Sequence, residues 1–426
     1  MGNTCLNIVV SYDLLTKLIF IDTTSFSVTG KKYKNEGKIE LKHGHSKDHR
    51  KDLKQLVYLL ASTDDGLPLY AETKSGNTHD NSLFQDTIQN LHYLIGKDLE
   101  EKFLVLDSAL YNRKFLTNEF IKGRWITRVP ESVKLCKDKV SEKRINWIKI
   151  DKDFKYYEVL VKHCGVKQRW IVVRHRKPKY KEIATFDKKL DKQEKAIKKN
   201  HQRLVNKVFP DKKEAQIYGE NQRKQYPNFI FEHHIVAVRK KVRGTRKTII
   251  TGYNIKPSFR RNESRIEKEK ERKGKFVIAT NCFDSSEISA NEIIDAYRNR
   301  NGAIEGCFKF LKRKDLGLNQ IYLKKESRIE SMMIIMTFIL FVNNLAQKKI
   351  RGYLKEYNHT VPNQKLHPIK NPTFKWISYI MRDVQKVWVL SRDNIVHHVS
   401  IKGLLKGIEP VIRAFGNHAL EIYGFV

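Results

Sequence analysis

The chain has 426 residues, enough for two or three domains, and 40% of them are apolar, which excludes a disordered protein. Its 83 Lys and Arg against 47 Asp and Glu give a net charge of +36, which indicates a polyanionic partner, most simply nucleic acid. The longest apolar run, residues 332–342, is too short to span a bilayer, so it predicts a buried helix and no membrane partner. Five scattered cysteines disfavour a disulfide framework and a zinc site, and suit a cytoplasmic, nucleoid-associated protein.

The first 130 residues alternate between strand-like and helix-like patterns. Apolar, β-branched runs that predict strands lie at 18–29, 102–111 and 124–130. Residues 55–77 predict a hairpin around the turn signal Asp64-Asp65-Gly66, and 80–95 carry the apolar stripe of an amphipathic helix. Together these elements predict an α/β fold with a mixed sheet and a long central strand.

The second part of the chain begins with short β-rich segments around a lysine-heavy helical stretch at 181–208. This stretch and a hairpin turn at 240–248 are expected to contact phosphates without reading base sequence. Beyond them, the sequence predicts a buried strand, a helix on each side of an Asn301-Gly302 turn, and an apolar helix, at 275–281, 291–314 and 329–346 respectively.

These patterns divide the chain into four parts. The first part of a catalytic core is expected at 1–145, a basic β-rich insertion with the lysine-rich helix at 146–260, the second part of the core at 261–355, and a helical and strand tail at 356–426.

Two carboxylates stand where buried strands should be apolar, Asp22 in "FIDTTSF" and Asp107 in "LVLDSAL". A hydrogen-bonded structural aspartate would explain either one alone, because a buried carboxylate needs a partner. Two in adjacent central strands favour a divalent cation, and hard oxygen ligands favour Mg²⁺ or Mn²⁺. Glu305 opens a helix, as an ordinary helix-start glutamate would, and is the candidate third ligand of two metal ions for phosphoryl transfer.

Several segments together resemble the DDE transposases of bacterial insertion sequences, in the branch with a β-rich insertion before the last glutamate. They are "FIDTTSFSVTG", "GHSKDHRKDLKQ", "GLPLYAETKSGNTHD", "LVLDSALYNRKFL", "KFVIATN", "AYRNRNGAIEGCFKFLK" and "NPTFKWI", and they run over nearly the whole chain. The resemblance implies a ribonuclease-H-like mixed sheet flanked by helices, with Asp22, Asp107 and Glu305 as catalytic, metal-binding carboxylates. It also implies two Mg²⁺ or Mn²⁺ ions, double-stranded DNA (transposon ends and target) as partner, and a homodimer in the active complex.

The family's Tyr-Arg-Glu-Lys signature is similar to Tyr297, Arg300, Glu305 and Lys312. Four residues separate Arg300 from Glu305 where three are usual, so either the Asn301-Gly302 turn absorbs the extra residue or Arg298 takes the arginine's role. The side chains expected to contact DNA around this signature are Tyr297, Arg298, Arg300, Lys309 and Lys312.

Some alternatives stay open. The spacing of His43, His45 and His49 permits a zinc site, but a charged, DNA-facing loop fits better because no apolar residue precedes Leu53. Trp125 and Trp170 are expected in the core. Only 21 residues precede Asp22, where relatives of the resembled family carry a helical region, so impaired recognition of transposon ends is expected. The competing functions are a DNA-binding remnant of a transposase and another ribonuclease-H-like metal-dependent nuclease.

Overall fold

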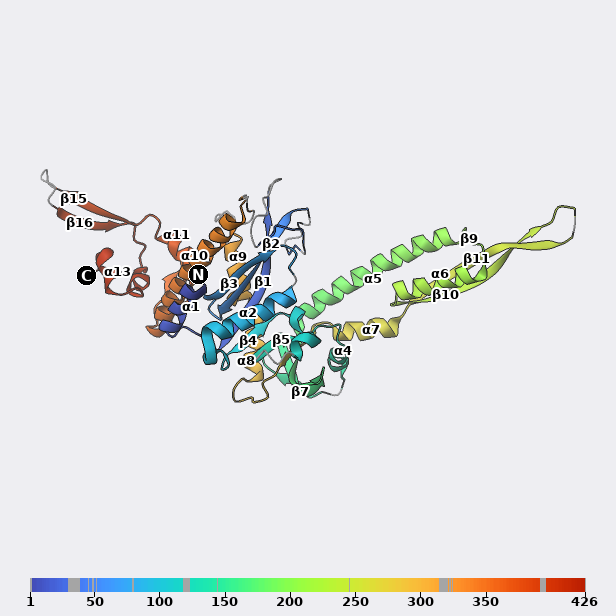
Figure 1. The fold of residues 1–426 in the computed structure, drawn as a ribbon, viewed down its shortest axis with the longest axis horizontal. Helices are drawn as coiled ribbons and strands as arrows, with labels where there is room; N and C mark the ends of the chain where they lie inside the picture. Colours follow the sequence, from blue (N-terminus) through green and yellow to red (C-terminus); the bar gives the residue numbers. More distant parts are fainter. Residues whose placement is uncertain are drawn as a thin grey trace. The chain divides into compact units, whose positions relative to one another are not determined.

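The computed structural model describes the chain except for residues 1, 30–38, 45, 48, 49, 51, 79, 118–122, 144, 245, 314–320, 322, 324, 391–395 and 426. The chain divides into two compact units (Figure 1). Unit 1 consists of residues 1–127, 164–166 and 280–426, and unit 2 of residues 128–163 and 167–279. The predicted insertion at 146–260 falls largely in unit 2, and the four-part division of the chain stays a prediction.

Unit 1 is built on a mixed sheet in the order β3-β2-β1-β4-β5. Its strands are β1 (Leu18–Val28), β2 (Lys54–Thr63), β3 (Pro68–Ser75), β4 (Phe103–Leu106) and β5 (Arg124–Arg128). β1, β2 and β3 pair antiparallel, whereas β4 pairs parallel with β1 and β5 with β4. The predicted hairpin turns at Gly66, whose φ of +77° favours glycine. The expected α/β class, with a mixed sheet flanked by helices, is confirmed.

Helices accompany this sheet in unit 1. They are α1 (Gly2–Ser11), α2 (Asp80–Ile95), α3 (Arg113–Leu116), α8 (Ala290–Ala303), α9 (Glu305–Leu311) and α10 (Glu326–Glu356). α2 spans the residues that the apolar stripe predicts, and its Phe84, Ile88 and Leu91 are buried. α1 is not predicted from the sequence: it contacts the edge strand β3 and buries Cys5, Leu6 and Val9.

The apolar helix α10 is buried on one face only. The run 332–342 was expected to be a buried helix, and Met333, Met336 and Leu340 are indeed buried, but an opposite face is exposed. That exposed face carries Ile334, Ile335, Phe338, Ile339 and Val342. By length and composition alone α10 could cross a membrane, and 33% of its most apolar 18-residue window is buried. The absence of a membrane partner stays a prediction.

The rest of unit 1 is the C-terminal tail. Its elements are β13 (Val361–Pro362), β14 (Pro368–Ile369), α11 (Phe374–Ile380), β15 (Gln385–Leu390), β16 (Val396–Lys402), α12 (Glu409–Arg413) and α13 (Asn417–Ile422). The last turns of α10 pack Ile350 and Leu354 against Ile377, Ile408 and Val411 of this tail.

Unit 2 contains a sheet in the order β12-β8-β7-β6 and a second sheet in the order β10-β11-β9. The strands are β6 (Ile148–Lys149), β7 (Phe154–His163), β8 (Val166–His175), β9 (Val208–Phe209), β10 (Phe229–Lys241), β11 (Thr248–Arg261) and β12 (Lys275–Thr280). The helices are α4 (Lys134–Ser141), α5 (Arg176–Leu204), α6 (Lys212–Gln225) and α7 (Glu263–Arg272). The predicted helix at 181–208, hairpin at 240–248 and strand at 275–281 are therefore confirmed, within a few residues at their ends.

Candidate active site

Strand pairing places the two predicted aspartates side by side. β1 and β4 run parallel, with Phe20 opposite Val105. Asp22 and Asp107 each lie two residues beyond that pair, so both side chains project on the same face as Phe20 and Val105. The two aspartates thus meet at the carboxyl end of β4, in the two adjacent central strands that the sequence predicts.

Local backbone donors fix both carboxylates. The N–H of Thr23 donates to Asp22 Oδ1 at 2.8 Å, and the N–H of Ser108 donates to Asp107 Oδ1 at 2.7 Å. The Asp22 side chain is 10% exposed and that of Asp107 is 36% exposed. In each carboxylate, one oxygen therefore accepts a hydrogen bond from the next residue's backbone N–H. The remaining lone pairs of these poorly solvated carboxylates need a cationic partner.

Arg300 supplies that cation. Its Nη2 donates to Asp22 Oδ2 at 3.0 Å and its Nη1 to Asp107 Oδ1 at 3.2 Å, so one guanidinium bridges both carboxylates. Burial alone would raise the pKa of Asp107, but the charge and hydrogen bond of Arg300, the Ser108 N–H and the charge of Lys47 together outweigh it, so the pKa is lowered. Burial likewise opposes the charge on Arg300, and the two aspartates more than compensate, so the pKa of Arg300 is raised. Arg300 therefore favours the ionised form of Asp107 and bridges its carboxylate to that of Asp22.

α8 carries Arg300 to this position. The helix starts at a capping box in which the Ser289 side chain accepts from the Glu292 N–H and the Glu292 side chain accepts from the Ser289 N–H. The helix runs through Asn301-Gly302 to Ala303 and breaks at Ile304 (φ −115°, ψ −41°), and α9 opens at Glu305. The extra residue between Arg300 and Glu305 is therefore absorbed by this break.

The expected turn at Asn301-Gly302 is accordingly wrong. Both residues lie within α8, because a single Gly costs a helix only about 1 kcal/mol and the flanking residues favour the helix. Arg298, the alternative for the signature arginine, pairs with Asp295 on its own helix at 3.3 Å. The bridge to Asp22 and Asp107 is made by Arg300.

Lys47 is a site residue that the sequence did not single out. Its Nζ lies 3.7 Å from Asp22 Oδ1, and it donates to the Thr23 backbone carbonyl and, at 3.1 Å, to the Thr23 hydroxyl. The Lys47 N–H donates to Ser25 Oγ at 3.0 Å, which ties the loop to β1. Lys47 belongs to the "GHSKDHRKDLKQ" segment, so that charged loop reaches the first aspartate.

A polar cavity of about 420 Å³ lies beside Lys47. Its lining includes Thr23, Ser25 and Gln55, and hydroxyl groups of this kind suit contacts to phosphate oxygens. Two glycines close one side: a Cβ on Gly44 would come within 2.0 Å of the Gly76 carbonyl oxygen, so only glycine allows this approach.

The other predicted site residues lie farther along α8 and α9. Tyr297 and Glu305 are half-buried and Lys309 is exposed. Lys312 is half-buried, with its Nζ 5.4 Å from the ring centroid of Phe26 on β1. Among the described residues, no three His, Cys, Asp or Glu side chains are grouped so that they could hold a metal ion. The structure thus brings Asp22 and Asp107 together and does not gather Glu305 with them, so the triad stays a prediction.

The two aspartates nevertheless have the donors that a divalent cation needs. Their oxygens converge on one positive charge, supplied here by Arg300, and carboxylate oxygens are the hard ligands that Mg²⁺ and Mn²⁺ prefer. A divalent ion at this place would displace or share the position of the Arg300 guanidinium. The residues present therefore fit such an ion.

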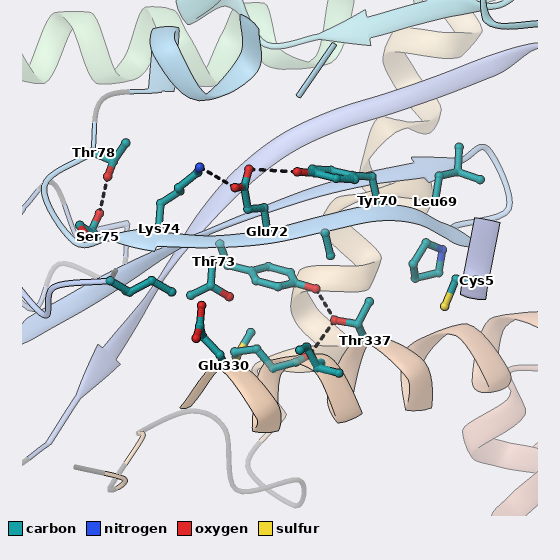
Figure 2. Close-up of a pocket in the computed structure, with 16 residues that line it drawn as sticks. Cys5, Leu69, Tyr70, Glu72, Thr73, Lys74, Ser75, Thr78, Glu330 and Thr337 are labelled. Atoms are coloured by element: carbon teal, nitrogen blue, oxygen red, sulfur yellow. Dashed lines mark hydrogen bonds and ion pairs between the residues drawn. The ribbon is translucent and has the colours of Figure 1, made fainter. Parts of the chain in front are cut away.

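A second cavity of about 340 Å³ lies on unit 1 between β3 and α10, away from the aspartates (Figure 2). Tyr70 donates to Glu72 at 3.2 Å, and Glu72 pairs with Lys74 at 2.5 Å along β3. Glu330 and Thr337 of α10 line the opposite side. Because these charges already satisfy one another along the strand, the cavity offers no group poised for phosphoryl transfer.

The structure also gives the positions of one of the three clustered histidines and of both tryptophans considered above. His43 is exposed, whereas His45 and His49 lie outside the described residues, so a zinc site there rests on no observation. Trp125 and Trp170 are 5% and 0% exposed, which confirms them as core residues.

Known proteins similar to this chain are transposases. The sequence matches the family described as "Transposase DDE domain" over residues 14–342. No match is found among curated proteins. Among solved structures, the chain is similar to piggyBac transposase in a synaptic complex with hairpin DNA, at 9% identity and a TM-score of 0.35, over 81% of this chain and 53% of that one. It is also similar to Mos1 transposase in a paired-end complex with the left transposon end, at 18% identity and a TM-score of 0.17, over 28% and 37% of the two chains.

The chain thus spans about half the length of the piggyBac transposase chain and a smaller share of the Mos1 chain. The family match covers more than half of the chain and includes both aspartates, Arg300 and Glu305. The protein belongs to the transposase DDE domain family.

Proposed function

We propose that this chain is a transposase that cleaves DNA and joins strands at the ends of a bacterial insertion sequence, with Mg²⁺ or Mn²⁺ held by Asp22, Asp107 and Glu305. The observation that carries the proposal is the convergence of Asp22 and Asp107, from adjacent parallel strands, on a single cation. The family match over residues 14–342 supports the reaction class.

The chemistry of phosphoryl transfer explains this arrangement. Divalent ions, when bound, would activate the attacking oxygen and stabilise the leaving one. Asp22 and Asp107 would hold those ions, and the lowered pKa of Asp107 keeps it ionised for that role. Glu305 opens α9 five positions after Arg300, and we assign it as the third ligand.

Arg300 then has a second role. With a divalent ion held by the aspartates, the Arg300 guanidinium would be free to bind two phosphate oxygens through two parallel hydrogen bonds. Lys47 lies on the other side of Asp22 and offers a second cation beside the reacting phosphate. Tyr297, Arg298, Lys309 and Lys312 extend this DNA-contacting surface along α8 and α9.

The net charge of +36 supports double-stranded DNA as the partner, both as transposon end and as target. We further propose that the active complex is a homodimer on paired ends and that the protein acts in the cytoplasm, on the nucleoid. These assignments rest on the family and on charge.

A catalytically impaired DNA-binding remnant is the second candidate. The observation that favours it is that the Arg300 guanidinium pairs with both aspartates, the side chains that would have to bind the ions. The two candidates differ in whether a divalent ion can replace Arg300.

Nicking of supercoiled plasmid with Mg²⁺ or Mn²⁺ tests the proposal. The variants are Asp107→Asn and Glu305→Gln, and the matched control is Lys355→Gln on the exposed end of α10. Metal-dependent nicking should be lost in the two carboxylate variants and kept in the control, with plasmid binding intact in all. Binding without nicking in the unmodified protein would favour the remnant, and nicking that survives both carboxylate changes would place the site elsewhere.

A further inference from the structure

The β10–β11 hairpin of unit 2 ends in a long two-stranded ribbon whose described end residues are all exposed. β9 pairs with β11 only at Tyr253 and Asn254, so within the described residues the hairpin continues beyond β9 as two strands alone (Figure 1). Pairing persists to Lys241 opposite Thr248, past a register shift between Val238 and Arg239. Every described residue from 239 to 250, named here the ribbon apex, is exposed.

The root of the same hairpin is firmly anchored. Phe229 and Phe231 of β10 pack in one apolar cluster with Leu190 and Ile197 of α5. Ile255 of β11 packs in another, with Leu204, Phe209 and Ala215. The apex is therefore the outer end of an arm whose base is held by two small cores, and it does not need its own packing to keep its direction.

The ribbon apex is strongly cationic. Six of the nine residues from 239 to 247 are Lys or Arg, and residues 233–261 contain no Asp or Glu. Among the described residues, Arg239, Lys240, Lys241, Arg243 and Arg246 form no ion pair. Successive side chains of a strand face opposite ways, so Arg239 and Lys241 project from one face of the ribbon and Lys240 from the other.

A bare ribbon of this kind is unfavourable by itself. Two strands without a third strand or a covering helix are marginally stable in water, and six like charges in one turn repel one another. The arrangement becomes favourable when a polyanion with charge on both sides of the ribbon is bound. The major groove of duplex DNA is such a partner, because it admits a two-stranded β-ribbon between two phosphate backbones.

We propose that the ribbon apex is a DNA-binding arm that enters the major groove of the duplex, with its Lys and Arg side chains on the flanking phosphates. The exposed Ile249 and Ile250 lie on opposite faces of the ribbon, so one of them would face the floor of the groove, where apolar side chains contact thymine methyl groups. The inference rests on the proposed function only in taking DNA as the polyanion. It adds a contact outside unit 1, in which Asp22 and Asp107 lie.

The test compares two triple variants of the full chain. Lys240, Arg243 and Arg246 are changed to Gln in one, and the exposed Lys97, Lys355 and Lys406 of unit 1 are changed to Gln in the other. Binding to a mixed-sequence DNA duplex is followed by fluorescence anisotropy over a series of KCl concentrations. The apex variant should lower the slope of log Kd against log[KCl] by about 2.7, since each phosphate contact contributes about 0.9. It should also bind at least about tenfold more weakly, while the control changes little.

A second measurement, protection of guanine N7 from methylation, tests whether the protein occupies the major groove. The unmodified protein should protect guanine N7 atoms of the duplex from dimethyl sulfate, and the apex variant should lose part of that protection. Equal losses of affinity in the two triple variants, or an unchanged N7 protection pattern, would overturn the proposal. Because every described residue of the apex is exposed, circular dichroism and thermal unfolding should be unchanged in the apex variant. Neither the anisotropy titration nor the N7 protection requires strand cleavage. Absence of nicking would therefore contradict the proposed function without affecting this test.

The other possible occupant is a second copy of the chain, added edge to edge to the ribbon. That arrangement would give a dimer in sedimentation without DNA, and replacing three of the six cations, as in the apex variant, would reduce their repulsion and strengthen the dimer. A DNA-free dimer that tightens in the apex variant would therefore also overturn the DNA-binding arm.

Discussion

Arg300 Nη2 lies 3.0 Å from Asp22 Oδ2, although 278 positions separate the two residues in the chain. The same guanidinium reaches Asp107 at 3.2 Å. One side chain on α8 therefore joins the two central strands of unit 1 at the point where the family's chemistry is expected. The signature around Glu305 predicts a DNA contact for Arg300, whereas in the structure its partners are the two carboxylates.

The first prediction concerns this bridge. Arg300→Ala should destabilise the protein by about 3 kcal/mol, because it leaves two poorly solvated carboxylates facing each other without a cation. Arg300→Lys should recover only part of the loss, since an ammonium cannot bridge two carboxylates as the guanidinium fork does. Urea unfolding followed by fluorescence measures both. Unfolding curves for Arg300→Ala that match those of the unmodified protein would mean that the bridge contributes nothing to stability.

The second prediction concerns Lys47. Lys47→Met should slow metal-dependent nicking about tenfold, because it removes the cation beside Asp22. It should change the free energy of unfolding by less than about 1 kcal/mol, since the Lys47 side chain is 38% exposed. Lys42→Met on the same loop is the control, as Lys42 pairs with Glu40 and not with an aspartate of the site. Equal nicking rates for the two variants would exclude a role for Lys47 in the reaction.

The third prediction concerns the start of α8. Ser289→Ala removes the acceptor of the Glu292 N–H and should cost about 1 kcal/mol of stability. Ser289→Asp keeps a capping oxygen and should restore most of it. Nicking should fall in parallel with stability in Ser289→Ala, because α8 positions Arg300. A change in nicking with no change in thermal unfolding would indicate that Ser289 acts by another route.

The fourth prediction concerns pH and unit 2. Burial lowers the pKa of His201 and of His233, whose ring centroids lie 6.1 Å apart. In the unfolded chain both histidines keep their ordinary pKa near 6.5, so below that pH the unfolded state binds more protons. Stability should therefore fall as pH drops through about 6.5 and continue falling to the lower pKa values of the folded protein.

The matched variant for this prediction is His201→Phe. Its ring would keep the packing against Phe231 and Phe259 and remove one titrating group. The decline of stability between neutral and mildly acidic pH should become shallower in the variant. An identical pH profile for the two proteins, measured by urea unfolding at each pH, would show that His201 does not control it.

Much of the fold is predictable from the sequence because its signals are local. The apolar, β-branched run at 18–29 and the continuous apolar run before Asp107 each predict a strand without reference to the rest of the chain. Once both are central strands of one sheet, the proximity of Asp22 and Asp107 follows from their position. The helix at 80–95 is equally local, since Phe84, Ile88 and Leu91 repeat at helical spacing.

Prediction from the sequence fails where contacts between residues far apart in the chain determine the local structure. The Asn301-Gly302 pair is a strong local turn signal, but α8 continues through it because tertiary packing outweighs the modest cost of one glycine. α1 is missed because β-branched residues such as Val9 and Val10 lower helix propensity, and only its packing on β3 stabilises the helix. Lys47 lies on a polar loop whose route to Asp22 depends on the contact between Gly44 and Gly76, which no local pattern reveals.

The most direct test of the central claim is a Mn²⁺ titration followed by the electron paramagnetic resonance of free Mn²⁺. The unmodified protein should bind Mn²⁺, and Asp22→Asn and Asp107→Asn should each abolish that binding. Arg300→Ala should bind Mn²⁺ about tenfold more tightly, since the competing cation is gone and a tenfold change corresponds to about 1.4 kcal/mol. Mn²⁺ binding that is unchanged in both aspartate variants would contradict the account, because the paired carboxylates would then not be the metal site.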